Sequence, residues 1–206
     1  MYAHAMTGQP VLDIAPFSAA SSPRNHEELL RVARALRSGG HRALGLFPAG
    51  PHAAVPPIAL QLARAMVEAS GESVALVDAN VRLPAFPPPP QSEPPEPFSP
   101  DQDDRASLFA ERELEPSLYL LSPRSIARSG AGVPQLALLV ERYRDRYAHL
   151  VADLTGFDQI GDHLSAAALV DGVIVVARSG ASKETELLRI RADLPQAKTL
   201  GVLLTG

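Results

Sequence analysis

Side chains that commonly perform catalysis are sparse in this sequence. The 206 residues contain no cysteine, which excludes thiolate nucleophiles, disulfides and cysteine-ligated metal sites. No serine lies in a G-x-S-x-G stretch, so the nucleophile elbow of serine hydrolases is missing. We expect no metal centre and no cofactor, because the six histidines occur singly, without H-x-x-x-H or H-E-x-x-H spacing: His4, His26, His41, His52, His149 and His163.

The elements that would position any remaining site are apolar runs alternating with amphipathic stretches. Strands are predicted at 43–47, 73–77, 118–121, 149–153, 172–177 and 200–204, and helices at 26–38, 57–70, 107–112, 134–145, 165–169 and 183–193. Buried strands interleaved with helices require crossover connections and a sheet covered on both faces. We therefore predict an α/β fold with a doubly wound, mostly parallel sheet and helices on both faces.

Composition divides the chain into an arm and one domain. Residues 1–25 lack helical or strand periodicity and are predicted to be a flexible N-terminal arm, whereas residues 26–206 are expected to form a single domain. From residue 84 to 100, nine of seventeen residues are proline, and an acidic stretch follows. No helix or central strand tolerates that density, so residues 84–104 are predicted to be a mobile insertion outside the core.

Charge and hydropathy argue against nucleic-acid binding and against a membrane-spanning segment. The formal net charge is -4 and the pI is about 5.9, which gives no electrostatic footprint for nucleic acid. No run of about 18 apolar residues occurs, and the first ten residues lack the basic and apolar regions of an export signal. We expect a cytoplasmic protein whose association with a membrane, if any, goes through a partner.

Five stretches carry a resemblance to a known family. They are ELLRVARALRS, ALGLFPAGPHAAVPPIALQLARAM, VALVDANVRLP, YAHLVADLTG, and the closing pair DGVIVVARSG with LGVLLTG. In this order they resemble the cytoplasmic domain of bacterial tyrosine kinases of capsule and exopolysaccharide synthesis, relatives of the chromosome-partitioning and septum-positioning P-loop ATPases. The resemblance runs from about Glu27 to Gly206 and implies a fold like that of P-loop NTPases.

The resemblance places a phosphate-binding loop after the first strand, but its chemical groups are missing. In G-x-x-x-x-G-K-[ST], backbone N–H groups wrap the phosphates, the lysine meets the β- and γ-phosphates, and the hydroxyl binds magnesium. Here Ala49 and Ala54 take the glycine positions, Val55 the lysine position and Pro56 the hydroxyl position. Pro56 and Pro57 also lack N–H donors, although proline suits a helix start. We predict a degenerate loop that binds no nucleotide; a different register of the loop is the alternative.

The acidic residues of the family are partly kept. In active relatives the two carboxylates of VALVDANVRLP help to organise magnesium; here they are Asp78 and the amide Asn80, followed by Arg82. Asp153 stands where the family has its magnesium-water aspartate. Because two carboxylates without a lysine do not make a phosphoryl-transfer site, we interpret these residues as remnants that cap backbone N–H groups at strand ends.

A charged helix before the first strand is the candidate interface. Related kinases carry Glu-x-x-Arg-x-x-Arg there and use it to assemble rings. Glu28, Arg31 and Arg34 have this spacing, whereas aligning Leu36-Arg37-Ser38 with the family's Leu-Arg-Thr puts Arg31 at the glutamate position. The two registers exclude each other, and a solvated basic helix face is the alternative. Glu28, Arg31, Arg34 and Arg37 are therefore candidate contact residues.

Together these patterns predict a chain that is not an enzyme. The expected function is a non-catalytic interaction or regulatory module in bacterial exopolysaccharide synthesis or export, or in a polar assembly. The expected partner is a membrane polysaccharide co-polymerase, an intact homologous kinase or a second copy of the chain. Two alternatives stay open: an active ATPase or tyrosine kinase with an atypical loop, and a scaffold whose proline-rich tract docks on another protein.

Overall fold

The computed structural model describes residues 16–17, 23–80, 109–123 and 132–206. The predicted proline-rich insertion at 84–104 lies outside these residues, and so does most of the predicted arm. Within the described ranges, none of the helices is both long and apolar enough to traverse a lipid bilayer.

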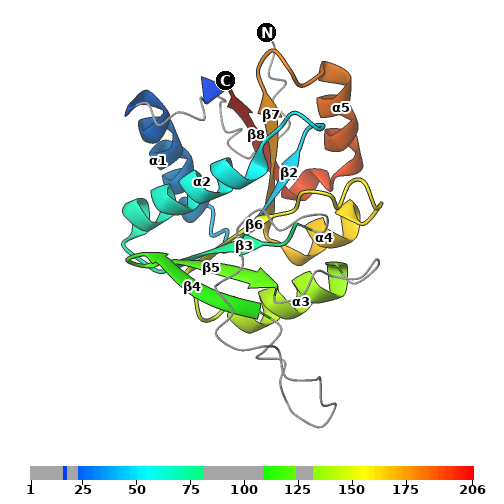
Figure 1. Ribbon diagram of the computed structural model, residues 1–206. Coiled ribbons are helices and arrows are strands. Elements are labelled where there is room, and N and C mark those ends of the chain that lie inside the picture. Colours follow the sequence, from blue (N-terminus) through cyan, green and yellow to red (C-terminus); the bar gives the residue numbers. More distant parts are fainter. Residues whose placement is uncertain (1–15, 18–22, 81–108, 124–131) are drawn as a thin grey trace.

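An eight-stranded sheet forms the centre of the molecule (Figure 1). Its strand order is β1-β8-β7-β2-β6-β3-β5-β4, and every neighbouring pair is parallel except β4 with β5. The strands are β1 (Pro16–Phe17), β2 (Ala43–Pro48), β3 (Val74–Asp78), β4 (Phe109–Glu115), β5 (Leu118–Pro123), β6 (His149–Asp153), β7 (Gly172–Arg178) and β8 (Thr199–Thr205). All residues of β2, β3 and β6 are buried, as expected for parallel strands covered on both faces.

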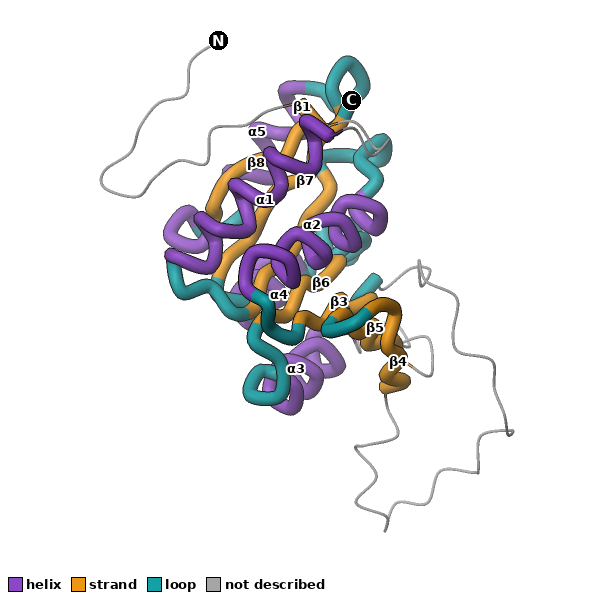
Figure 2. Tube along the Cα trace, turned by 90° about the vertical axis from the view of Figure 1, so that its left-hand side faces the viewer, coloured by secondary structure: helices purple, strands orange, loops and turns teal. Residues whose placement is uncertain are grey.

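Helices cover the two faces of the sheet (Figure 2). The helices are α1 (Pro23–Ser38), α2 (Val55–Ser70), α3 (Gly132–Tyr143), α4 (His163–Leu169) and α5 (Glu184–Asp193), with a short 3-10 turn at Gln196–Lys198. Apolar residues of α1 and α2 pack on one face, while those of α3, α4 and α5 pack on the other. The predicted doubly wound, mostly parallel α/β sheet is confirmed.

The sequence of helix α2 explains where this helix begins and ends. It contains Pro56 and Pro57 in its first turn, where a proline breaks no intrahelical hydrogen bond. Its buried stripe includes Ile58, Leu62 and Met66, at helical spacing. Gly71 ends the helix in the left-handed region with φ 70°, and its N–H donates to the Val67 carbonyl at 2.7 Å.

The predicted helix at 107–112 is wrong, because Phe109–Glu115 forms the antiparallel strand β4. The residues Ala, Glu, Arg and Leu favour helix in isolation, but tertiary pairing overrides that preference. Phe109 and Ala110 are buried in the strand, and β4 pairs with β5 along its length. Residues 116–117 turn the chain, with Ser117 at φ 66°.

Two elements begin inside the segment predicted as an arm. Helix α1 starts at Pro23 rather than at residue 26, because a proline in the first turn needs no N–H partner. The two residues of β1 pair in parallel with the end of β8. Helix α1 therefore includes the last three residues of the predicted arm, Pro23, Arg24 and Asn25, and the flexibility of the rest of the arm stays a prediction.

Candidate functional site

The candidate site lies at the carboxyl ends of three neighbouring strands, β2, β6 and β3. Strand β6 sits between β2 and β3, although these two are consecutive in the sequence on either side of α2. Asp153 at the end of β6 is the register partner of Leu46 in β2 and of Asp78 in β3. Crevices at such switches of strand order are where doubly wound sheets bind ligands.

The loop between β2 and α2 is poor in groups that could hold an anion. The residues 48, 51, 56 and 57 are prolines and supply no N–H. The Ala49 N–H donates to the Val176 carbonyl at 2.7 Å, and the Ala53 N–H donates to the Gly50 carbonyl at 3.4 Å. Ala54 occupies the N-cap of α2 and has no side chain that could form a capping hydrogen bond. Prolines and these two internal hydrogen bonds therefore reduce the number of backbone donors that the loop could offer to an anion.

A carboxylate from α5 lies against the same loop. Gly50 has φ 87°, and a Cβ atom placed on it would overlap the Glu186 carboxylate. The Glu186 Oε2 also accepts the Lys183 N–H at 3.1 Å, which fixes the side chain at the start of α5. A negative charge at this place repels a phosphate group. Nothing in the sequence indicated a role for Glu186, because α5 is distant from the loop along the chain.

Asp153 is fully buried at the end of β6. Its Oδ1 accepts the Thr155 N–H at 2.9 Å and the Thr155 hydroxyl at 2.5 Å, whereas Oδ2 has no hydrogen-bond partner. Burial raises the pKa of Asp153 to about 6, the two hydrogen bonds from Thr155 oppose that rise, and the Asp78 carboxylate adds to it. The Asp153 side chain thus caps its own turn, and its second oxygen is buried without a hydrogen bond.

The other acidic-motif residues lie beside Asp153 where they are described. Asp78 is buried, and the Asn80 N–H donates to its Oδ1 at 3.4 Å. The Asn80 side chain is half-buried. Arg82 lies outside the described residues. The structure therefore brings Asp78, Asn80 and Asp153 together, and among the described side chains no three of His, Asp or Glu gather as a metal site.

The candidate interface residues lie along α1. Arg31 forms an ion pair with Glu28 at 2.6 Å, one turn away on the same helix. Arg37 donates to the Ala69 carbonyl at 3.1 Å and so ties the end of α1 to the end of α2. Arg34 is exposed. Arg31 and Arg37 therefore serve the fold in part.

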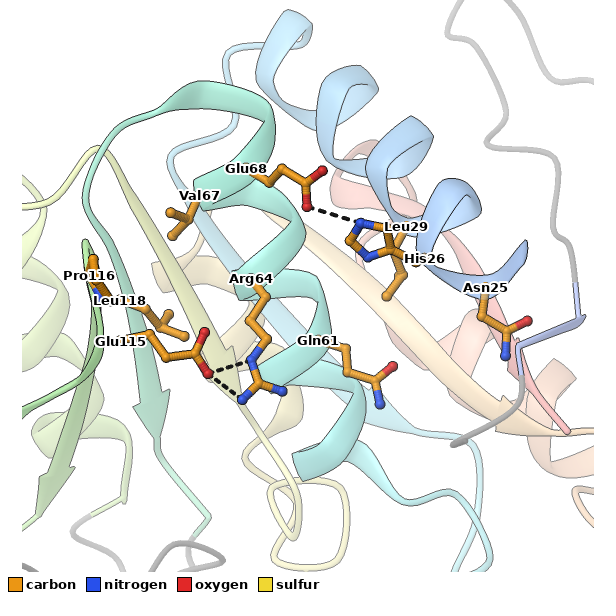
Figure 3. Close-up of a pocket in the computed structure, with 10 residues that line it drawn as sticks. All are labelled: Asn25, His26, Leu29, Gln61, Arg64, Val67, Glu68, Glu115, Pro116 and Leu118. Atoms are coloured by element: carbon orange, nitrogen blue, oxygen red, sulfur yellow. Dashed lines mark hydrogen bonds and ion pairs between the residues drawn. The ribbon is translucent and has the colours of Figure 1, made fainter. Parts of the chain in front are cut away.

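A groove of about 350 Å³ runs beside α1 (Figure 3). Two polar contacts border it: His26 Nε2 lies 3.0 Å from Glu68 Oε2, and the Arg64 Nε donates to Glu115 at 2.8 Å. These contacts link α1 to α2, and α2 to the end of β4. The sequence did not reveal this groove. Its lining is Asn25, His26, Leu29, Gln61, Arg64, Val67, Glu68, Glu115, Pro116 and Leu118.

Comparison with solved structures identifies the class of fold. No family model matches the chain, and the comparison with curated proteins finds no match. The BceF tyrosine kinase domain is similar, with a TM-score of 0.65, 17% identity, and coverage of 96% of this chain and 93% of that chain. The VpsO kinase domain has a TM-score of 0.65 and 18% identity, and covers 88% of this chain and 96% of that chain.

The kinase domain of the Escherichia coli tyrosine kinase ETK has a TM-score of 0.63 and 14% identity, and covers 95% of this chain and 89% of that chain. The chain therefore has the fold of bacterial tyrosine kinase domains, and the resemblance found in the sequence is confirmed. The prediction that the chain is not an enzyme is wrong at this level, because the fold is one that carries kinases.

Proposed function

We propose that the chain is a kinase-like domain that acts by binding a protein partner in bacterial exopolysaccharide synthesis or export, or in a polar assembly. The observation that carries the proposal is the contrast between the complete sheet and the loop after β2 with the first turn of α2, which has no lysine and no hydroxyl side chain and in which three residues are prolines without an N–H group. The fold is retained where phosphate-binding groups are absent, which favours a role for the surface. We place this role in the cytoplasm.

The surface proposed for the contact is the exposed side of α1. Arg34 and its neighbours Arg31 and Arg37 present positive charge there, and Glu28 lies among them. Such charges steer a partner and form hydrogen bonds across an interface. Three partners fit the proposal: the cytoplasmic segment of a membrane polysaccharide co-polymerase, an intact homologous kinase, or a second copy of this chain.

Charge reversal tests this surface. Arg34→Glu alone, and Arg31→Glu with Arg34→Glu and Arg37→Glu, are expected to weaken capture of a co-polymerase segment or a homologous kinase in a pull-down. Arg191→Glu is the matched control, because Arg191 is also an exposed helical arginine but lies on α5. Arg34→Glu should leave the melting temperature nearly unchanged. Equal binding by Arg34→Glu and wild type would mean that α1 is only a solvated face.

The loop itself is tested by calorimetry with magnesium-ATP and magnesium-ADP. We expect no binding, because Val55, Pro56 and Pro57 replace the groups that hold phosphates and Glu186 lies against Gly50. A dissociation constant below about 10 μM, which is about 7 kcal/mol of binding, would contradict this expectation.

A second candidate is an active ATPase or tyrosine kinase with an atypical loop. The kinase fold and the adjacent buried carboxylates Asp78 and Asp153 favour it. The test is ATP hydrolysis and tyrosine phosphorylation by the purified chain, with Asp153→Asn as the comparison. Activity that is lost in Asp153→Asn would replace the interaction role by this one. A scaffold role for the proline-rich tract predicts instead that deleting residues 84–104 abolishes partner capture.

A further inference from the structure

The groove beside α1 has a rim of charged side chains that a partner can reach. The groove lies between the first two turns of α1, the second half of α2, and the end of β4 with the turn that follows. Figure 3 shows Glu68 pointing toward α1 and Arg64 pointing toward β4, on opposite sides of α2. The exposed fractions of the rim side chains are 52% for His26, 54% for Glu68, 48% for Arg64 and 43% for Glu115. About half of each charged side chain is therefore open to contact.

Apolar side chains line the groove between these charges. Leu29 of α1 and Leu118 of β5 are buried, Val67 of α2 is half-buried, and Pro116 is exposed. Leu29 and Leu118 belong to the core cluster that joins α1 and α2 to the sheet, and Val67 packs against that cluster. Their positions are fixed by this packing. An aliphatic side chain that entered the groove would therefore meet a preformed apolar surface.

The rim carries more negative charge than permanent positive charge. Arg64 is paired with Glu115, to which its Nε donates at 2.8 Å. Glu68 has His26 as its ion-pair partner at 3.0 Å, and a histidine is charged only when it is protonated. Among the described side chains, Glu68 is therefore a half-exposed carboxylate without a permanent cation beside it. A lysine or arginine of a partner complements this charge.

We propose that the groove binds a basic, apolar segment of a partner protein, with an aliphatic side chain against Val67 and Leu118 and a lysine or arginine beside Glu68. Sites for small molecules bury most of the ligand surface. Half-exposed walls leave one side of an occupant in water, which suits a segment of a larger protein that presents only one face. This site goes beyond the proposed contact at Arg34, because an arginine surface selects acidic groups and the groove selects basic ones.

The test is titration of the ¹⁵N-labelled full chain with short peptides that have blocked ends, followed by NMR. The probe is the peptide GKLVKLG, which combines lysine with aliphatic residues. We expect saturable shifts of the amide signals of residues 26–29, 61–68 and 115–118, with a dissociation constant below about 1 mM. The acidic peptide GELVELG should bind these residues at least about tenfold more weakly, because its charges repel Glu68. The peptide GKSSKSG should bind at least about fivefold more weakly, because it has no aliphatic side chain to bury.

Substitutions at the rim test the charge. Glu68→Gln should weaken binding of GKLVKLG about two- to fivefold, and Glu68→Lys about tenfold or more. Glu141→Lys is the matched control for the change in net charge, because Glu141 is exposed on α3, which packs on the other face of the sheet. All three variants should keep the melting temperature of wild type nearly unchanged, because these side chains lie at the surface. Binding that persists in Arg34→Glu would support a site separate from the arginines of α1.

Three results would overturn the proposal. The first is that GKLVKLG leaves the amide signals of residues 61–68 in place up to about 1 mM. The second is that GELVELG shifts these signals as strongly as GKLVKLG, or that lysine amide alone does so, since the groove would then not select a basic, apolar segment. The third is that Glu141→Lys weakens binding as much as Glu68→Lys, which would mean attraction by net charge rather than by the groove.

Discussion

Asp153→Asn is expected to stabilise the protein at neutral and alkaline pH. Burial raises the pKa of Asp153 from its ordinary value of 3.8 to about 6, despite the two hydrogen bonds from Thr155, and the Asp78 carboxylate adds to the rise. The folded state therefore favours the protonated carboxyl. Its stabilising contribution is complete below about pH 4 and is lost as the pH rises through 6.

The size of the effect follows from the two pKa values. A difference of about 2 in pKa corresponds to about 3 kcal/mol of free energy of unfolding, which is the upper limit of the loss in wild type above pH 7. Asparagine keeps an oxygen that can accept from Thr155 and carries no charge. We expect Asp153→Asn to exceed wild type by about 1 to 3 kcal/mol at pH 8 and to match it near pH 4.

Urea unfolding of both proteins across this pH range measures the difference. Asp171→Asn is the matched control, and its effect on the free energy of unfolding is expected to have the opposite sign. Burial raises the pKa of Asp171, but the N–H groups of Ala43 and Arg42 and the Arg144 guanidinium outweigh burial and lower it. Asp171→Asn should therefore destabilise, by less as the pH falls. The reasoning is refuted if Asp153→Asn is no more stable than wild type at pH 8, or if the difference does not change with pH.

Three further substitutions probe the packing, each by urea unfolding. Gly71→Ala should lower the free energy of unfolding by about 1 kcal/mol, because the residue ends α2 at φ 70°. A Cβ atom would meet no neighbour there, so the loss would come from backbone strain, and an unchanged stability would contradict the assignment of that cap. Gly45→Ala should lower the free energy of unfolding by about 1 to 3 kcal/mol, because the new Cβ would lie 2.5 Å from the Leu154 side chain. The double variant with Leu154→Ala should lose less stability than the sum of the losses in the two single variants. Lys198→Met should cost about 1 to 3 kcal/mol, because its Nζ donates to three carbonyls at the end of α4, and a neutral result would show that water replaces them.

The sequence was sufficient to predict the parallel core but not its edges. The run at 43–47 is apolar throughout, and residues 150–152 are apolar between His149 and Asp153, a pattern typical of strands buried on both faces. The stretch Phe109–Glu115 has helical propensity, and its strand conformation depends on pairing with β5, which no local pattern encodes. Strand β1 has only two residues, too few for any periodicity to be visible.

The candidate site could be predicted only in part, because local patterns show where strands end but not which distant segments pack against them. The positions of Asp78 and Asp153 follow from their places at the ends of apolar runs, and the parallel sheet then brings them side by side. The approach of Glu186 to Gly50 depends on the packing of α5 beside a loop more than a hundred residues earlier in the chain. Contacts of that kind arise only from the complete fold.

The central position of β2 has a consequence for how the protein folds. Ala43 pairs with Leu150 and Leu44 with Gly172, so both neighbours of β2 come more than a hundred residues later in the chain. During synthesis at about 5 to 20 residues per second, β2 and β3 leave the ribosome many seconds before the strand that separates them. Pairing between such distant segments is slow. We therefore expect the apolar strands β2 and β3 to depend on chaperones in the cell until β6 and β7 have been made.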